Sequence, residues 1–217
     1  MVCLSEPVVG RAPLLLKSGP MADSAPFDAR GVANLLLDMG DQRGRAFTNL
    51  VMQKLLYFAH ARCLVAAGKP LLTGYFEAWR YGPVHPAVYQ SFRDARSEII
   101  RFRARRTDLL SGRQSIVEPP DSPIARTHVE FVVDTYGRLP VNRLVEISHA
   151  RDAPWHYVVS RANKQVTLGL RISDKIIVER FKRHKVSVGG AFELGDFIED
   201  TPLTADRSGE YRGITKG

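Results

Sequence analysis

The sequence has few cysteines and no long apolar run, and both shortages limit the kind of protein it can encode. Its 2 cysteines, Cys3 and Cys63, lie far apart in 217 residues, so neither a disulfide framework nor a cysteine zinc site is predicted. No hydrophobic segment of signal-peptide length opens the chain, and no run approaches the ~18 residues needed to cross a bilayer. We therefore expect a soluble protein of the reducing cytoplasm, outside the membrane.

Common catalytic and cofactor-binding signatures are also missing. There is no H-E-x-x-H, C-x-x-C or G-x-S-x-G motif, no phosphate loop with G-K-[ST], and no helix-turn-helix with a clear basic recognition helix. These absences predict no enzyme activity, no metal and no cofactor. An unrecognised hydrolase built from Glu77, His60 and His149 is an alternative, although nothing in their spacing indicates that they meet.

What the chain does have is length, apolar content and positive charge. With 44% hydrophobic residues it is long enough for one compact domain with a real core, and its net charge is +8 at pH 7. Arg101, Arg103 and Arg105 recur at every second position, which puts them on one face if the segment is a strand. A second basic cluster lies over 175–185. We interpret these clusters first as solvated surface, then as a site for an acidic protein, and last as a nucleic-acid site.

Three regions are predicted along the chain. They are a disordered leader over 1–26, a single domain over 27–184 and a partly flexible extension over 185–217. Translation can start at Met1 or at Met21. The extension contains the acidic segment AFELGDFIED, which either packs back on the domain or contacts a partner.

The strongest helical signal spans about 49–67, and the rest of the domain is expected to form around it. One apolar face consists of Met52, Leu55, Leu56, Ala59, Cys63 and Ala66. Thr48 is the expected N-cap. Gln53, Tyr57 and His60 form a narrow polar stripe on the opposite side, and we predict that they share a hydrogen-bond network with Glu77.

Shorter elements are predicted on both sides of this helix. A first helix spans about 28–39, capped by Asp28 and ended by Gly40. The aromatic, glycine-punctuated segment 71–84 predicts a short extended segment or hairpin, and a second hairpin is expected within 98–120.

Later helices are predicted wherever a proline or a capping side chain precedes an apolar pattern. Their expected starts are Pro86, Pro123, Pro140, Asp152 and Ser173. On the helix from Pro123, the face expected to meet the core holds Ile124, His128, Phe131 and Thr135. The predicted fold class is therefore mainly α, a single compact helical domain around a buried central helix with a small β-hairpin element.

Several short motifs follow one another in a specific order between about 28 and 181. They are Q-K-L-L-Y-F at 53–58, E-A-W at 77–79, G-P-V at 82–84, Tyr89, and H-x-x-x-x-P-W at 149–155. In this order and spacing the chain resembles the Panacea domain, the SocA-like antitoxin family. The residues that form this motif core are Gln53, Lys54, Tyr57, His60, Glu77, Trp79, Gly82, Pro83, Tyr89, His149 and Trp155.

The resemblance implies a mostly α-helical domain that binds and neutralises a cognate protein toxin encoded beside it. It also associates the SocA-like branch with delivery of the toxin to ClpX of the ClpXP protease. Segments outside the motif core are where the choice of partner is expected to be encoded. The candidate partner-binding residues are Arg101, Arg103, Arg105, Arg106, Phe192 and Phe197. The alternative function is a basic nucleic-acid-binding regulator that controls its own operon.

Overall fold

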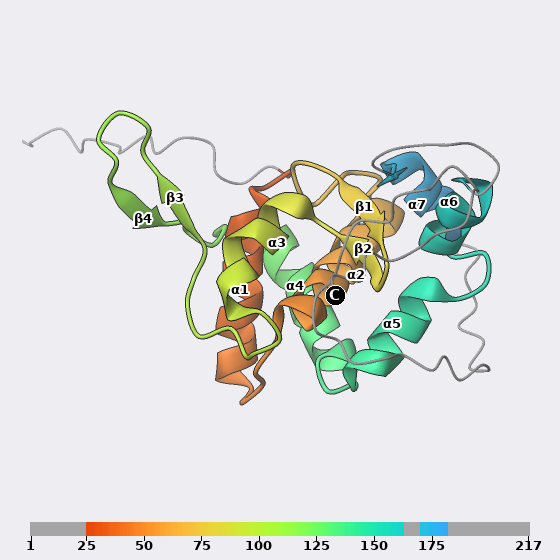
Figure 1. Ribbon diagram of the computed structural model, residues 1–217, viewed down its shortest axis with the longest axis horizontal. Coiled ribbons are helices and arrows are strands. Elements are labelled where there is room, and N and C mark those ends of the chain that lie inside the picture. Colours follow the sequence, from red (N-terminus) through yellow and green to blue (C-terminus); the bar gives the residue numbers. More distant parts are fainter. Residues whose placement is uncertain (1–24, 163–169, 182–217) are drawn as a thin grey trace, which may run out of the picture.

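Helices dominate the structure, a computed structural model that describes residues 25–162 and 170–181 (Figure 1). Two small antiparallel sheets complete the regular elements of these ranges. The predicted fold class, mainly α in one domain, is confirmed. Nearly all of the predicted leader, the whole extension over 185–217, and with it Phe192 and Phe197, lie outside the described residues.

Helix α2, Asn49–Ala67, runs through the middle of the domain (Figure 1). The Thr48 hydroxyl accepts a hydrogen bond from the Val51 amide at 3.4 Å, and Gly68 ends the helix with a left-handed φ of 66°. Helices α1, α3, α4, α5 and α7 all contact α2. The predicted apolar face is buried as far as Cys63, but Ala66 is exposed because the last turn of α2 leaves the core.

By length and composition alone, α2 is apolar enough to cross a bilayer, so the expectation that no segment approaches that length was wrong. However, 67% of its most apolar window is buried inside the domain. Neighbouring helices cover this surface, so α2 is the core helix of the fold.

Helix α1, Ala29–Gln42, begins as predicted, because an Asp28 carboxylate oxygen accepts a hydrogen bond from the Arg30 amide at 2.9 Å. The predicted end at Gly40 was wrong, since the helix continues to Gln42. Gly40 instead permits a close packing contact: a Cβ built on it would lie 2.5 Å from the ring of Phe47.

Helix α4, Pro123–Tyr136, packs against both α1 and α2. Its buried residues are Ala125, His128, Val129, Val132 and Val133. The predicted face was right for His128 but wrong for Ile124, Phe131 and Thr135, which are exposed. The true face is displaced by about one position, and one position is ~100° around a helix.

The other helices and the two sheets join this core. The helices are α3 (Pro86–Phe92), a 3₁₀ turn η1 (Arg93–Ala95), α5 (Val141–His149), α6 (Pro154–Ala162) and α7 (Asp174–Phe181). The first sheet has the order β2-β1-β5, from Gly82–Val84, Phe76–Trp79 and Arg171–Ile172. The second pairs β3 (Arg105–Thr107) with β4 (Gln114–Ile116) and projects from the body of the domain (Figure 1). Both predicted hairpins are confirmed.

Candidate functional site

Most motif residues lie where α2 packs against the β1–β2 turn and helices α3 and α5, and where β1 meets α6. The four that lie on α2 are all buried, with at most 3% of each side chain exposed: Gln53, Lys54, Tyr57 and His60. Polar side chains in such positions need partners, because an unsatisfied buried polar group costs about 1 to 3 kcal/mol.

Gln53 joins α2 to the start of α3. Its side-chain oxygen accepts a hydrogen bond from the His85 amide at 2.9 Å, and its NH₂ group donates to Asn49 Oδ1 at 3.1 Å. Asn49 in turn donates to the backbone carbonyl of Tyr89 at 3.2 Å. Two amide side chains on one face of α2 thereby fix both ends of the first turn of α3.

Lys54 joins α2 to the β1–β2 turn. The Lys54 Nζ donates to the Pro83 carbonyl at 3.2 Å, inside the fold. Gly82, with a φ of 107°, lies against this ammonium group: a Cβ built there would be 3.1 Å from Lys54 Nζ and 2.6 Å from Ser148 Oγ. Only glycine fits this space and this backbone angle, which accounts for the G-P-V motif.

Aromatic side chains connect the same turn to α3, α5 and α6. Trp155 Nε1 donates to the Trp79 carbonyl at 2.9 Å, and the Trp79 and Tyr89 rings are 4.7 Å apart. The His149 imidazole stacks on Trp155 at 3.7 Å with an interplanar angle of 12°. The half-buried Glu77 accepts from Trp79 Nε1 at 2.8 Å. The E-A-W and H-x-x-x-x-P-W motifs are therefore parts of one packing contact.

His149 is held in its neutral form. Burial, together with the positive charges of Lys54 and His156, lowers the pKa of His149 to about 3. An imidazole that stays neutral across the physiological range and stacks on an indole ring is suited to packing.

His60 belongs to a different contact. Its Nδ1 accepts from the Leu72 amide at 3.3 Å, so the proton is on Nε2, which donates to Asp174 Oδ1 at 3.1 Å. His60 thereby joins α2 to the segment before β1 and to the start of α7. Tyr57 packs edge-on against Phe76 with ring centroids 5.3 Å apart, and burial raises the pKa of its hydroxyl well above the ordinary value.

The predicted network shared by Gln53, Tyr57, His60 and Glu77 was wrong. Gln53 bonds to Asn49 and the His85 amide, and His60 bonds to Asp174 and the Leu72 amide. Glu77 bonds to Trp79, and the Tyr57 hydroxyl has no partner among the described residues. In the alternative catalytic set, Glu77 and His149 belong to the same packing contact through Trp79 and Trp155, whereas His60 binds the segment before β1 and the start of α7. Within residues 25–162 and 170–181, no three His, Cys, Asp or Glu side chains are grouped to hold a metal ion.

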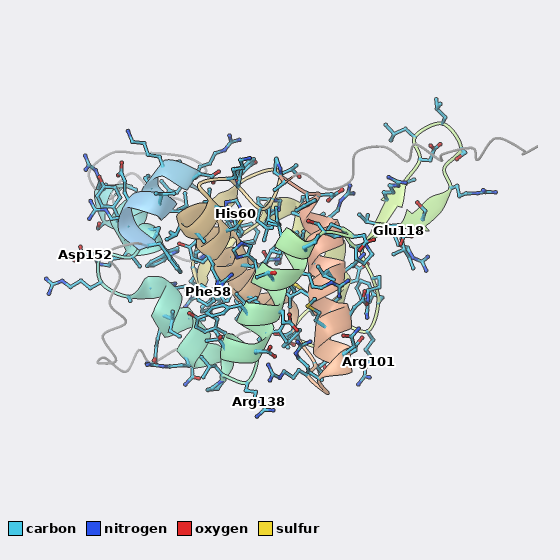
Figure 2. All side chains as sticks on the ribbon, turned by 180° about the vertical axis from the view of Figure 1, so that it is seen from behind. Phe58, His60, Arg101, Glu118, Arg138 and Asp152 are labelled. Atoms are coloured by element: carbon cyan, nitrogen blue, oxygen red, sulfur yellow. The ribbon has the colours of Figure 1, made fainter. Side chains whose placement is uncertain are left out.

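The predicted basic strand face does not form. Strand β3 starts only at Arg105, so Arg105 and Arg106 lie on alternate sides of it, both exposed. Arg103 precedes the strand and is bound to α1, donating to Asp38 at 2.8 Å and to Asp41 at 2.6 Å. Arg101 is exposed and lies near the far end of α1, away from the projecting hairpin (Figure 2).

A buried amide holds the base of the β3–β4 hairpin. Asn34, on α1 and fully buried, donates to the carbonyls of Ala104 and Val117 at 3.1 and 2.7 Å. Its side-chain oxygen accepts from the Ala104 amide at 2.8 Å, and the Val117 amide donates to the Ala104 carbonyl at 2.9 Å. These four bonds close the hairpin where it leaves the domain.

Two leucines occupy the tip of this hairpin. Leu109 is 96% exposed and Leu110 is 99% exposed. The sequence interpretation missed them because it followed the arginines of the same segment. A usable signal was present: D-L-L-S-G places two apolar residues inside a polar hairpin turn, where polar residues are the rule.

A shallow pocket lies between α6, β5 and α7. Arg161, Arg171 and Lys175 line it, together with the Tyr157 ring. Arg161 donates to the Tyr157 hydroxyl at 2.6 Å, and the Arg180 guanidinium lies over the same ring at 3.9 Å. Part of the predicted basic cluster over 175–185 is thus engaged with an aromatic neighbour, and its later members lie beyond the described ranges.

The chain is similar to known antitoxins in sequence. The family described as "Antitoxin SocA-like, Panacea domain" matches residues 52–156, a range that holds every motif residue and the β3–β4 hairpin. The protein named "Antitoxin SocA" from Caulobacter vibrioides (strain NA1000 / CB15N) is 46% identical over 180 residues, which cover 83% of this chain and 96% of that protein. No solved structure matches the chain significantly.

Proposed function

Because the chain belongs to the Panacea-domain family of SocA-like antitoxins, we propose that it binds and neutralises a protein toxin encoded beside its own gene. The observation that carries the proposal is the 46% identity to an antitoxin over 83% of the chain. At this identity and coverage the similarity to that relative extends far beyond the short motifs.

The geometry of the motif core supports binding rather than chemistry. The polar groups of Gln53, Lys54 and His60 are buried and hold one element to another. A catalytic group has to reach a substrate, and buried side chains committed to neighbouring elements do not. The motif core is therefore the scaffold that sets the shape of the domain, and partner contacts belong on its exposed surface.

The proposal has a second stage, delivery of the bound toxin to ClpX of the ClpXP protease. An adaptor has to hold its cargo through a stable fold, and a well-packed helical core provides that. We place the activity in the cytoplasm, because the buried thiol of Cys63 is free and a reducing compartment keeps thiols in that form.

Co-expression with the neighbouring gene tests the first stage. The toxin gene is induced alone, with this chain, and with a Leu56→Asp variant that places a charge in the core. We expect growth to stop in the first case, to recover in the second, and to stop again in the third. Recovery with the unfolded variant, or arrest with the wild-type chain present at equal level, contradicts the proposal.

The half-life of the toxin tests the second stage. After protein synthesis is stopped, a tagged toxin should disappear faster in cells that contain both this chain and ClpX than in cells lacking either one. Equal half-lives in all three strains, with growth still rescued, leave neutralisation by occlusion and remove the adaptor role.

A further inference from the structure

We propose that the β3–β4 hairpin is a recognition arm whose tip, Leu109 and Leu110, inserts into an apolar pocket rimmed by carboxylates on the toxin. This inference rests on the proposed function, and it adds the surface used and the chemistry of the partner's site. Neither leucine belongs to the motif core.

The exposure of the two leucines separates them from other apolar side chains. Leu109 and Leu110 are 96% and 99% exposed, whereas the other exposed large hydrophobic residues among those described range from 39% to 44%. A half-exposed apolar side chain is ordinary on a protein surface. Two neighbouring leucines with essentially no contact to their own domain are not, and adjacent apolar exposure marks interaction sites.

The tip is already closed in the free chain. The Asp108 carboxylate accepts hydrogen bonds from the Leu110 amide at 3.1 Å, the Ser111 amide at 2.7 Å and the Ser111 hydroxyl at 2.8 Å. The Gly112 amide donates to the Asp108 carbonyl at 2.8 Å, and Gly112 has a φ of 66°. A turn fixed in this way presents both leucines together and loses little conformational entropy on binding.

The base of the arm is as firmly held as its tip. All six residues of β3 and β4 are exposed, so the strands contribute little to the core, and an isolated two-stranded hairpin is marginal in water. The buried Asn34 side chain nevertheless makes three hydrogen bonds to its first and last backbone groups. The fold thus holds in place a projection that it does not need for packing (Figure 1).

The charged residues around the arm indicate the chemistry of the partner's binding site. Arg105 and Arg106 are exposed on β3, Arg113 is exposed just before β4, and Asp108 is the acidic residue of the same hairpin. Arginine is enriched at protein interfaces, and polar groups form the rim around an apolar centre. The complementary site is a hydrophobic pocket flanked by aspartate or glutamate.

The test measures the affinity of purified full-length chain for the purified product of the neighbouring gene. We compare wild type with the double variant Leu109→Ser/Leu110→Ser, and use Ile124→Ser as the matched control, since Ile124 is a 43% exposed apolar residue on α4. We expect Kd to rise by at least ~100-fold for the double variant, as for removing two buried leucines, and to change less than about threefold for the control. Thermal melting of the double variant should match that of wild type, because the two leucines contribute almost no buried surface in the free chain.

Charge reversal tests the rim separately. Arg105→Glu should slow association and reduce its salt dependence, whereas Arg138→Glu, which changes the net charge equally but lies on the exposed turn after α4, away from the hairpin in Figure 2, should do neither. Equal effects from the two variants mean that only net charge matters, and the acidic rim is then refuted.

The outcomes separate this inference from the proposed function. If wild type does not bind the neighbouring product, the proposed function fails. If wild type binds and the leucine variant binds equally well, the arm is refuted while the antitoxin assignment stands. The arm is also refuted if the leucine variant keeps toxin binding but loses self-association in solution, because the tip then binds a second copy of this chain. The same holds if the variant keeps toxin binding but no longer sediments with vesicles of anionic phospholipid, because the tip then binds a membrane.

Discussion

Replacing Asn34 by alanine tests whether the hairpin is anchored by a buried amide. The substitution removes three hydrogen bonds at a position with 0% exposure. The Ala104 carbonyl keeps its bond from the Val117 amide, so two backbone groups lose their partners: the Ala104 amide and the Val117 carbonyl. Each such buried group costs about 1 to 3 kcal/mol, and we expect Asn34→Ala to lower the free energy of unfolding by about 2 to 5 kcal/mol.

Urea denaturation followed by tryptophan fluorescence measures this loss, because Trp79 and Trp155 both report on the packed core. Asn142→Ala is the control, since Asn142 is exposed and its side chain caps only the Arg143 amide. The control should stay within about 0.5 kcal/mol of wild type. Hydrogen exchange adds a local readout: the Ala104 and Val117 amides should exchange faster in Asn34→Ala. A loss as small as that of Asn142→Ala, with unchanged exchange, would refute the anchoring argument.

Three further predictions concern the motif core and the charge of the chain. Gly82→Ala should lower the free energy of unfolding by about 2 kcal/mol or more, because its Cβ would lie 2.6 Å from Ser148 Oγ and 3.1 Å from Lys54 Nζ at a φ of 107°. Gly112→Ala, with open space around it, should cost only about 1 kcal/mol. Equal melting temperatures for the two variants would contradict the packing account. The pKa of His149 is lowered to about 3 in the folded chain, against ~6.5 in the unfolded chain, so the unfolded chain binds the proton first as pH falls. The free energy of unfolding should therefore drop by about 2 kcal/mol between pH 7 and pH 5. In denaturation curves measured across this range, His149→Phe should flatten that pH dependence. If the positive charge serves protein binding, a DNA fragment from the chain's own promoter should not be retarded in a gel at about 50 mM salt, and a salt-sensitive shift there would revive the operon-regulator alternative.

Local signals in the sequence were sufficient for much of the fold. The bounds of α2 and its Thr48 cap, the Asp28 cap of α1 and the two hairpins each depend on residues close together in the chain. Capping side chains, glycine and proline act within a few residues, so their effects can be predicted without knowing the tertiary structure.

Contacts between separate segments of the chain account for the errors. Gly40 was expected to end α1, but the close approach of Phe47 gives it a packing role inside the helix. Arg103 was grouped with a basic strand, but Asp38 and Asp41, more than sixty positions away, hold it against α1. A sequence alone does not say which distant carboxylate will meet which arginine.

The candidate site shows the same division. Sequence motifs identified residues that meet in space, among them Lys54 with Pro83 and Trp79 with Trp155. They did not show that Lys54, Pro83 and Trp79 are buried and that Trp155 is half-buried. The exposed leucines at the hairpin tip emerged only when the structure gave their surroundings.

The central claim, that this chain neutralises by binding a toxin, is tested most directly by titrating the purified product of the neighbouring gene with purified wild-type chain in a calorimeter. We predict saturable binding with Kd in the nanomolar to low micromolar range, which corresponds to a binding free energy of roughly −8 to −12 kcal/mol. The absence of any binding heat at several temperatures, with both proteins folded and with no co-elution on size exclusion, would contradict the account.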